Sequence, residues 1–362
     1  MSTLFDPITV GKLHLSSRLV MAPMTRNRAT ADGLVTDLTA EYYEQRASAG
    51  LIITESTQPS VIGQGYILTP GVHSPAQVEA WRKVTDAVHA QGGRIVAQLT
   101  HCGRIGHPSL YPDGVLPVAP SAVASGEHLI TLDGPLEHPT PRELTTDDIG
   151  TTINDFVSAA GNAIEAGFDA VEIHGANGFL LHQFLADNTN LRTDEYGGSL
   201  TNRIRFPVEV VTAVAAAIGP DRVGVRISPA STYNNMIEAD PVPVYTALLK
   251  ELAAIDIAYI HLVELGDREL TKSLRAVWPG VLILNPHATA EAFPATVDSA
   301  SQALEAGVAD AVALASSWLA NPDLPTRIKA GGPYNTPDPA TFYGGDHRGY
   351  TDYPALTNGQ NS

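Results

Sequence analysis

Eight short apolar runs, each followed by a loop and a helical pattern, constrain this sequence more than any other feature. The runs are Arg18–Ala22, Leu51–Thr54, Arg94–Gln98, Ala170–Ile173, Val223–Ile227, Ile257–Leu262, Val281–Leu284 and Ala311–Leu314. Nearly continuous apolar runs are typical of parallel strands that are buried on both faces. Helical stretches lie between them, such as Ser74–Gln91, which opens with Ser-Pro, and Thr146–Ala166, which ends before Gly167. The pattern predicts an α/β fold, a single (β/α)8 barrel.

We expect one domain over residues 1–362, with an N-terminal extension and a barrel core at about 18–330. Residues 100–145, after the third run, are rich in Pro, Gly, His and Ser. A loop of that length in a compact barrel predicts a lid or a wall of the active site. The tail 331–362 is rich in Pro, Gly and Tyr. We expect it to wrap the surface rather than to form a second domain.

The composition and net charge limit the classes of partner that this protein is expected to bind. Hydrophobic residues make up 44% of the chain and charged residues 17%, a balance that is typical of globular proteins. The net charge of −17 argues against nucleic acid and anionic membranes as partners, because both attract clustered Lys and Arg. The single cysteine, Cys102, excludes an intrachain disulfide and a thiolate metal cluster. The beginning of the chain lacks the pattern of a secretory signal, so we expect a cytoplasmic protein. Because nucleic acid and membranes are disfavoured, we expect the substrate to be a small molecule. The sequence leaves the oligomeric state open.

Polar residues follow several of the predicted strands. In such barrels, residues at the C-terminal ends of the strands face the active site. The residues at these positions are Thr25, Gln98, His101, His174, Asn177 and Arg226. A structural hydrogen bond would explain any one of them alone, and His174 could also cap the following helix. Because they come from four strand ends, we interpret them together as a small-molecule site.

His174 and Asn177 are three residues apart, just after a buried run. Both can donate a hydrogen bond toward one point, and two neutral donors at a carbonyl oxygen would stabilise the enolate that forms when an enone is attacked. A metal site is disfavoured, because no third carboxylate or thiolate lies nearby in the sequence. We therefore predict His174 and Asn177 as the catalytic pair.

Ten motifs stand in order along the chain: Leu4–Pro7, Met21–Arg26, Glu41–Gly50, Gln98–Arg104, His174–Asn177, Leu180–Phe184, Asn190–Ser199, Asn202–Phe206, Asn321–Leu324 and Gly349–Pro354. With these motifs the sequence resembles the Old Yellow Enzyme family from about residue 4 to about residue 356. The resemblance implies a barrel that binds FMN at the strand C-termini and accepts electrons from NAD(P)H. It implies hydride transfer to the β-carbon of an α,β-unsaturated carbonyl. By motif position, Thr25, Gln98 and Arg226 would contact the flavin ring, and His174 and Asn177 the substrate carbonyl.

Three positions depart from the family pattern. Phe179 stands where the family has the tyrosine that protonates the substrate, and phenylalanine has no proton to give. Pro286 falls at or beside a glycine whose N–H holds the FMN phosphate, and proline has no N–H. Ser316 stands where an arginine pairs with that phosphate, so a contact of about 1.5–3 kcal/mol is lost. His287 is a possible substitute cation.

These departures lead us to expect a redox-neutral isomerase or cyclase that no longer depends on FMN and uses no cofactor. In that interpretation Thr25, Gln98, His101, Phe179 and Arg226 form the substrate pocket. The alternative is an FMN-dependent NAD(P)H ene-reductase, in which Thr25, Gln98, Arg226 and Ser316 contact the cofactor. A third possibility is a non-catalytic binding protein. The flavin content of the purified protein discriminates between them.

Overall fold

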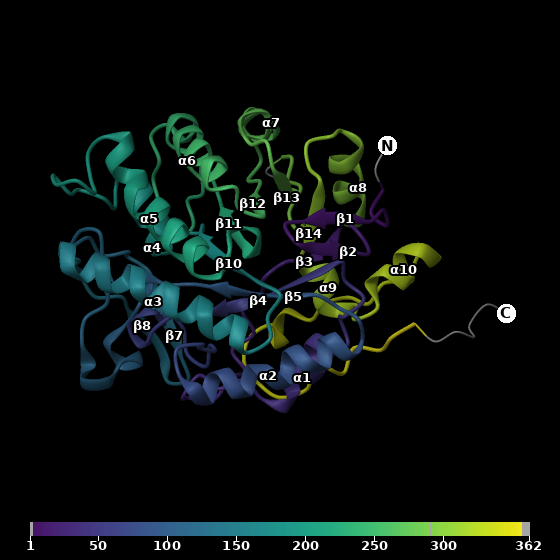
Figure 1. The fold of residues 1–362 in the computed structure, drawn as a ribbon. Coiled ribbons are helices and arrows are strands. Elements are labelled where there is room, and N and C mark those ends of the chain that lie inside the picture. Colours follow the sequence, from purple (N-terminus) through teal and green to yellow (C-terminus); the bar gives the residue numbers. More distant parts are fainter. Residues whose placement is uncertain (1–2, 290, 357–362) are drawn as a thin grey trace.

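The computed structural model describes residues 3–289 and 291–356. Its centre is a closed barrel of eight strands, in which each strand pairs in parallel with the next and the last pairs with the first (Figure 1). In chain order the barrel strands are β3 (Leu19–Met21), β4 (Leu51–Thr57), β5 (Ile95–Leu99), β10 (Ala170–Gly175), β11 (Val223–Ile227), β12 (Tyr259–Val263), β13 (Val281–Asn285) and β14 (Ala311–Leu314). The predicted (β/α)8 barrel is confirmed.

Helices surround the barrel, as Figure 1 shows. They are α1 (Asp37–Glu44), α2 (Pro75–Ala90), α3 (Thr146–Glu165), α4 (Leu180–Leu185), α5 (Leu200–Ile218), α6 (Pro241–Ile255), α7 (Arg268–Val277), α8 (Val297–Glu305), α9 (Ser316–Ala320) and α10 (Leu324–Ala330). Local chemistry sets the starts of the two helices that the sequence predicts. Ser74 caps α2 by accepting from the Gln77 N–H. The cap of α3 is Thr145, one residue before the predicted start, which forms a capping box with Asp148.

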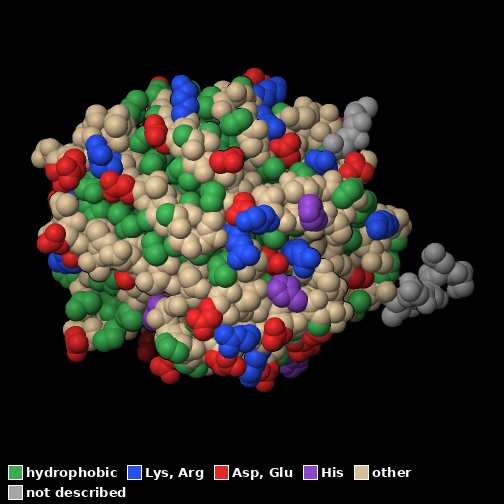
Figure 2. All heavy atoms as spheres, viewed as in Figure 1, with side chains coloured by type: hydrophobic (Ala, Val, Ile, Leu, Met, Phe, Trp, Pro, Cys, Tyr) green, Lys and Arg blue, Asp and Glu red, His purple; other side chains and the backbone are tan. Residues whose placement is uncertain are grey.

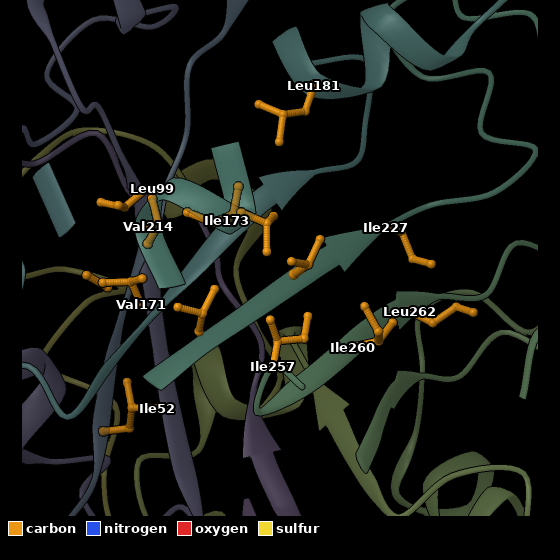
Figure 3. Close-up of a cluster of buried hydrophobic side chains, with 14 of the residues drawn as sticks. Ile52, Leu99, Val171, Ile173, Leu181, Val214, Ile227, Ile257, Ile260 and Leu262 are labelled. Atoms are coloured by element: carbon orange, nitrogen blue, oxygen red, sulfur yellow. The ribbon is translucent and has the colours of Figure 1, made fainter. Parts of the chain in front are cut away.

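The main core lies between the barrel and its helices. Figure 3 shows strand residues such as Val171 and Ile173 of β10 in one buried cluster with Val214 of α5. A second cluster lies at the start of the chain, where β1 (Ile8–Val10) and β2 (Leu13–Leu15) form an antiparallel hairpin. This hairpin packs Val10 and Leu15 against apolar residues of the barrel strands. The N-terminal extension is therefore integrated into the fold.

The loop predicted over 100–145 has its own local structure. It contains the antiparallel pair β7 (His128–Thr131) and β8 (Gly134–Glu137). It also contains the parallel pair β6 (Val118–Ala119) and β9 (Arg142–Glu143). Its role as a lid or wall stays a prediction.

The C-terminal tail is held by three buried arginines, Arg26, Arg28 and Arg46, which we call the arginine clamp. The Arg26 guanidinium donates to the carbonyls of Phe342 and Gly349, and that of Arg28 donates to the carbonyls of Asp346 and Arg348. Arg46 donates to the carbonyls of Trp318, Leu319 and Tyr350. The described part of the tail thus lies against the start of the chain. Residues 357–362 lie outside the described residues, and the single-domain organisation stays a prediction.

Charged side chains of both signs are distributed over the face shown in Figure 2. Within residues 3–289 and 291–356, no helix combines the length and the apolar character needed to cross a bilayer. The cytoplasmic location stays a prediction.

Candidate active site

Buried polar side chains line the interior of four neighbouring strands. They are Gln98 on β5, Glu172 and His174 on β10, Arg226 on β11 and His261 on β12. The strand register places Gln98 beside Glu172, and it places His174, Arg226 and His261 in one row. Residues two apart on a strand share a face, so Glu172 and His174 point to the same side of β10. The barrel thus gathers a polar cluster from residues that are up to 163 positions apart (98 to 261).

Glu172 is the centre of this cluster. Its Oε1 accepts from Gln98 Nε2 at 2.7 Å, and its Oε2 lies 3.0 Å from His261 Nδ1. Burial alone would raise the pKa of Glu172, but His261, Arg226 and Gln98 bring the pKa below its usual value. The carboxylate is therefore charged at neutral pH. It fixes the orientation of the Gln98 amide and balances the charge of Arg226.

Arg226 has a buried donor without a partner. The residue is 7% exposed, and its Nε has no hydrogen-bond partner among the described residues. Burial lowers the pKa of Arg226 from its ordinary value, and Glu172 opposes that shift. A buried guanidinium with a donor left over is costly unless something accepts from it. This feature favours an electron-rich ligand at the end of β11.

His174 is a neutral hydrogen-bond donor. Its Nδ1 accepts from the Ala176 N–H at 3.2 Å, so the ring proton is on Nε2. Burial, followed by the charge of Arg226, holds the pKa of His174 well below its usual value. The imidazole therefore stays uncharged at neutral pH and can donate from Nε2 without carrying a positive charge.

Asn177 lies in a turn that is fixed by the loop after β11. Its φ of 55° is in the left-handed region, which asparagine tolerates better than most residues. Its N–H donates to Ser228 Oγ at 2.8 Å, and its carbonyl accepts from Asn234 Nδ2 at 2.8 Å. These two bonds hold the backbone and leave the side-chain amide for a ligand.

Phe179 lies against His174, with the ring centroids 4.8 Å apart and the planes at 89°. Thr25 is half-buried after β3, where the neighbouring Arg26 N–H donates to Glu55 Oε2 at 3.1 Å. These placements agree with the predicted pocket, although the roles of the side chains stay predictions.

His101 has a different environment. Its Nδ1 accepts from the Gly103 N–H, its ring lies beside Gly63, and burial lowers its pKa to about 3. No hydrogen bond among the described residues joins His101 to His174 or Arg226, and its place in the substrate pocket stays a prediction.

The loops after β13 and β14 carry no Lys or Arg between positions 285 and 320. Burial lowers the pKa of His287, whereas the Glu264 carbonyl, 3.0 Å from His287 Nδ1, raises it. The suggestion that His287 acts as a substitute cation stays a prediction. Ser316 is half-buried at the start of α9.

A closed (β/α)8 barrel with buried polar side chains on its strands is compatible with a flavin-dependent oxidoreductase. The sequence profile of the NADH:flavin oxidoreductase / NADH oxidase family matches residues 3–335. The chain belongs to this family, the Old Yellow Enzymes.

Individual relatives are similar over nearly the whole chain. A probable flavin mononucleotide-dependent alkene reductase of Leishmania infantum is 43% identical over 366 aligned positions, which cover 98% of this chain and 97% of that protein. The 12-oxophytodienoate reductase 1 of Oryza sativa subsp. japonica is 40% identical, covering 98% and 93%. The solved structure of morphinone reductase in complex with tetrahydroNAD superposes with a TM-score of 0.94 at 43% identity, covering 100% of both chains.

The comparisons correct one expectation. The prediction that the protein uses no cofactor is wrong, because its family and its relatives are flavin oxidoreductases. The error came from treating Pro286 and Ser316 as decisive. The contacts at the phosphate are only part of the binding free energy of FMN, and the ring contacts do not depend on them. The comparisons also favour the ene-reductase alternative over isomerisation or cyclisation.

The polar residues that line the barrel suit a flavin ring. The ring edge presents both donors and acceptors, and the site contains a cationic Arg226 and a Gln98 amide that is oriented by Glu172 and Ser56. The β13 and β14 loops supply no Lys or Arg for the phosphate end.

Sequence reasoning missed Glu172 and His261. The period-two pattern of β10 was the available signal for Glu172, since it is inward-facing like His174. His261 interrupts an apolar run in the same way.

Proposed function

We propose that this protein is an FMN-dependent ene-reductase that uses NAD(P)H to reduce the C=C bond of α,β-unsaturated carbonyl compounds. The observation that carries the proposal is the neutral His174 donor, which lies beside the buried Arg226 in a barrel of the flavin oxidoreductase family. A related structure is a complex with tetrahydroNAD, which supports a nicotinamide reductant. A small-molecule substrate and a cytoplasmic location remain part of the proposal.

Thr25, Gln98 and Arg226 would hold the flavin ring. FMN, when bound, supplies the hydride that the reaction needs. His174 donates from Nε2 to the substrate carbonyl oxygen, and the Asn177 amide donates to the same atom. Both hydrogen bonds strengthen as negative charge develops on that oxygen, which lowers the barrier to attack at the β-carbon.

The experiment that tests this function follows product mass and nicotinamide oxidation together. Purified protein reconstituted with FMN is mixed with cyclohexenone, with and without NADPH or NADH. We expect a product heavier by two hydrogens that forms only with nicotinamide and flavin, at a rate matching nicotinamide oxidation. A product of unchanged mass, formed without nicotinamide, would contradict the proposal.

A second prediction concerns the phosphate end of the flavin. We expect Ser316→Arg to tighten FMN binding about ten-fold or more, because a charge-assisted phosphate contact is worth about 1.5–3 kcal/mol. The dissociation constant is measured from the quenching of flavin fluorescence. Ser317→Arg is the matched control, since it adds the same charge one residue further along. Equal effects of the two variants would mean that the phosphate does not lie at position 316.

A further inference from the structure

The proposed reaction needs a proton for the substrate α-carbon, and the position next to the carbonyl-binding pair cannot supply it. Phe179 has its ring edge-to-face with His174 and carries no exchangeable proton. Any donor from the protein must therefore reach the substrate from a side chain near Phe179.

Two such side chains pack on Phe179. It forms a small buried cluster with Cys102 and Ile105, and Tyr66 packs against this cluster. The rings of Tyr66 and Phe179 have centroids 6.2 Å apart and planes at 86°. Within this group of described residues, only the Tyr66 hydroxyl and the Cys102 thiol carry an acidic proton.

The Cys102 thiol and the Tyr66 hydroxyl have different surroundings. Cys102 is 4% exposed, and it packs tightly against Gly65. A Cβ atom placed on Gly65 would lie 2.5 Å from the Cys102 Sγ. The Tyr66 hydroxyl instead lies next to the side chains of Tyr233 and Asn234. Tyr233 is 59% exposed, which connects the hydroxyl to solvent.

Asn234 ties Tyr66 to the carbonyl-binding pair. Its Nδ2 donates to the Asn177 carbonyl at 2.8 Å, so the loop that contacts the Tyr66 hydroxyl also positions Asn177. Tyr66 itself is placed firmly, because its carbonyl accepts from Gln64 Nε2 and Thr69 Oγ1. The hydroxyl therefore lies on the same side of the site as Phe179 and Asn177.

We propose that Tyr66 is the proton donor to the substrate α-carbon in this protein, a role that rests on the proposed ene-reductase function. Hydride addition at the β-carbon moves the alkene electron pair toward the carbonyl and leaves an enolate on the oxygen held by His174 and Asn177. The O–H bond of Tyr66 then breaks, a C–H bond forms at the α-carbon, and the carbonyl double bond is restored. The tyrosinate regains its proton from water by way of Tyr233.

The ionisation of Tyr66 is consistent with this role. Burial is the main cause that raises the pKa of Tyr66 well above its usual value. The hydroxyl therefore keeps its proton at neutral pH, and the tyrosinate left after transfer recovers a proton readily.

The test separates the two halves of the reaction in the FMN-reconstituted enzyme by stopped-flow absorbance. We expect Tyr66→Phe to leave flavin reduction by NADPH unchanged and to slow reoxidation by cyclohexenone about 10²-fold, the usual contribution of a general acid. Adding Phe179→Tyr to Tyr66→Phe should restore fast reoxidation. Tyr111→Phe is the matched control, because the Tyr111 hydroxyl binds the Gln64 carbonyl of the same loop without contacting Phe179.

If the unmodified enzyme turns over normally and Tyr66→Phe is reoxidised at the same rate, Tyr66 is not the proton donor, and the proposed ene-reductase function still stands. Slow reoxidation in Cys102→Ala together with normal reoxidation in Tyr66→Phe would likewise overturn the assignment of Tyr66. If the unmodified enzyme is not reoxidised by any enone, the proposed function fails, and the need for a donor fails with it. Circular dichroism and flavin content of each variant show whether it has folded and bound FMN.

Discussion

Replacing His174 by alanine is expected to lower kcat/KM for an enone by about 10²–10³-fold, and loss of the Asn177 side chain by a similar factor. Each change removes one of two donors aimed at the oxygen that becomes an enolate. Because the two donors act on one atom, we expect the double variant to lose less than the product of the single losses.

The design of the Asn177 variant follows from its backbone. Alanine at a φ of 55° would add strain, so Asn177→Gly removes the amide while keeping the turn. His89→Ala is a matched control for His174→Ala: His89 pairs with Asp169, before the start of β10, away from the strand ends that carry the site. Steady-state rates with cyclohexenone and the free energy of unfolding are measured on every variant. Near-normal turnover with both side chains removed would mean that the carbonyl binds elsewhere.

Replacing Arg46 by alanine is expected to lower the free energy of unfolding by at least about 3 kcal/mol. Arg46 is fully buried, and its guanidinium donates to backbone carbonyls from α1, from α9 and from the tail. Its charged part also lies 3.9 Å from the centre of the Tyr42 ring, which itself stacks on Tyr350 at 4.2 Å. Removal of the side chain leaves several buried carbonyls without a donor, and each costs about 1–3 kcal/mol.

Guanidinium chloride unfolding followed by circular dichroism measures this effect, and Arg82→Ala is the control. Arg82 is 40% exposed in its side chain and pairs with Glu79 on one helix, so its removal should cost no more than about 1 kcal/mol. Equal losses in the two variants would show that the arginine clamp does not contribute to stability as proposed.

The barrel was predictable because parallel strands buried on both faces leave apolar runs that stand out in the sequence. The runs at Val223–Ile227 and Ala311–Leu314 coincide with β11 and β14. The pairs β6–β9 and β7–β8 gave no such signal, since their strands have two to four residues and several side chains face solvent. The partner of β6 also lies more than 20 residues away in the sequence, in β9.

The candidate site was predictable where it follows strand ends, and less so elsewhere. His174, Asn177 and Arg226 could be located because the fold dictates where strand ends meet. Tyr66 follows β4 after eight residues (58–65), so only packing against Phe179 shows its relevance. The balance between lost and retained flavin contacts was misjudged because a sequence shows which contacts are missing more readily than it shows how much binding free energy remains.

The arginine clamp has a consequence for the order in which the chain matures during synthesis. Arg26 and Arg28 leave the ribosome long before their carbonyl partners between Thr341 and Gly349, since Arg28 and Thr341 are 313 residues apart. Strand β3 likewise can pair with β14 only after β14 has been synthesised. The nascent chain must therefore carry these cations without their native partners through most of translation. Closure of the barrel and seating of the arginine clamp therefore require the chain as far as Gly349 to have been synthesised.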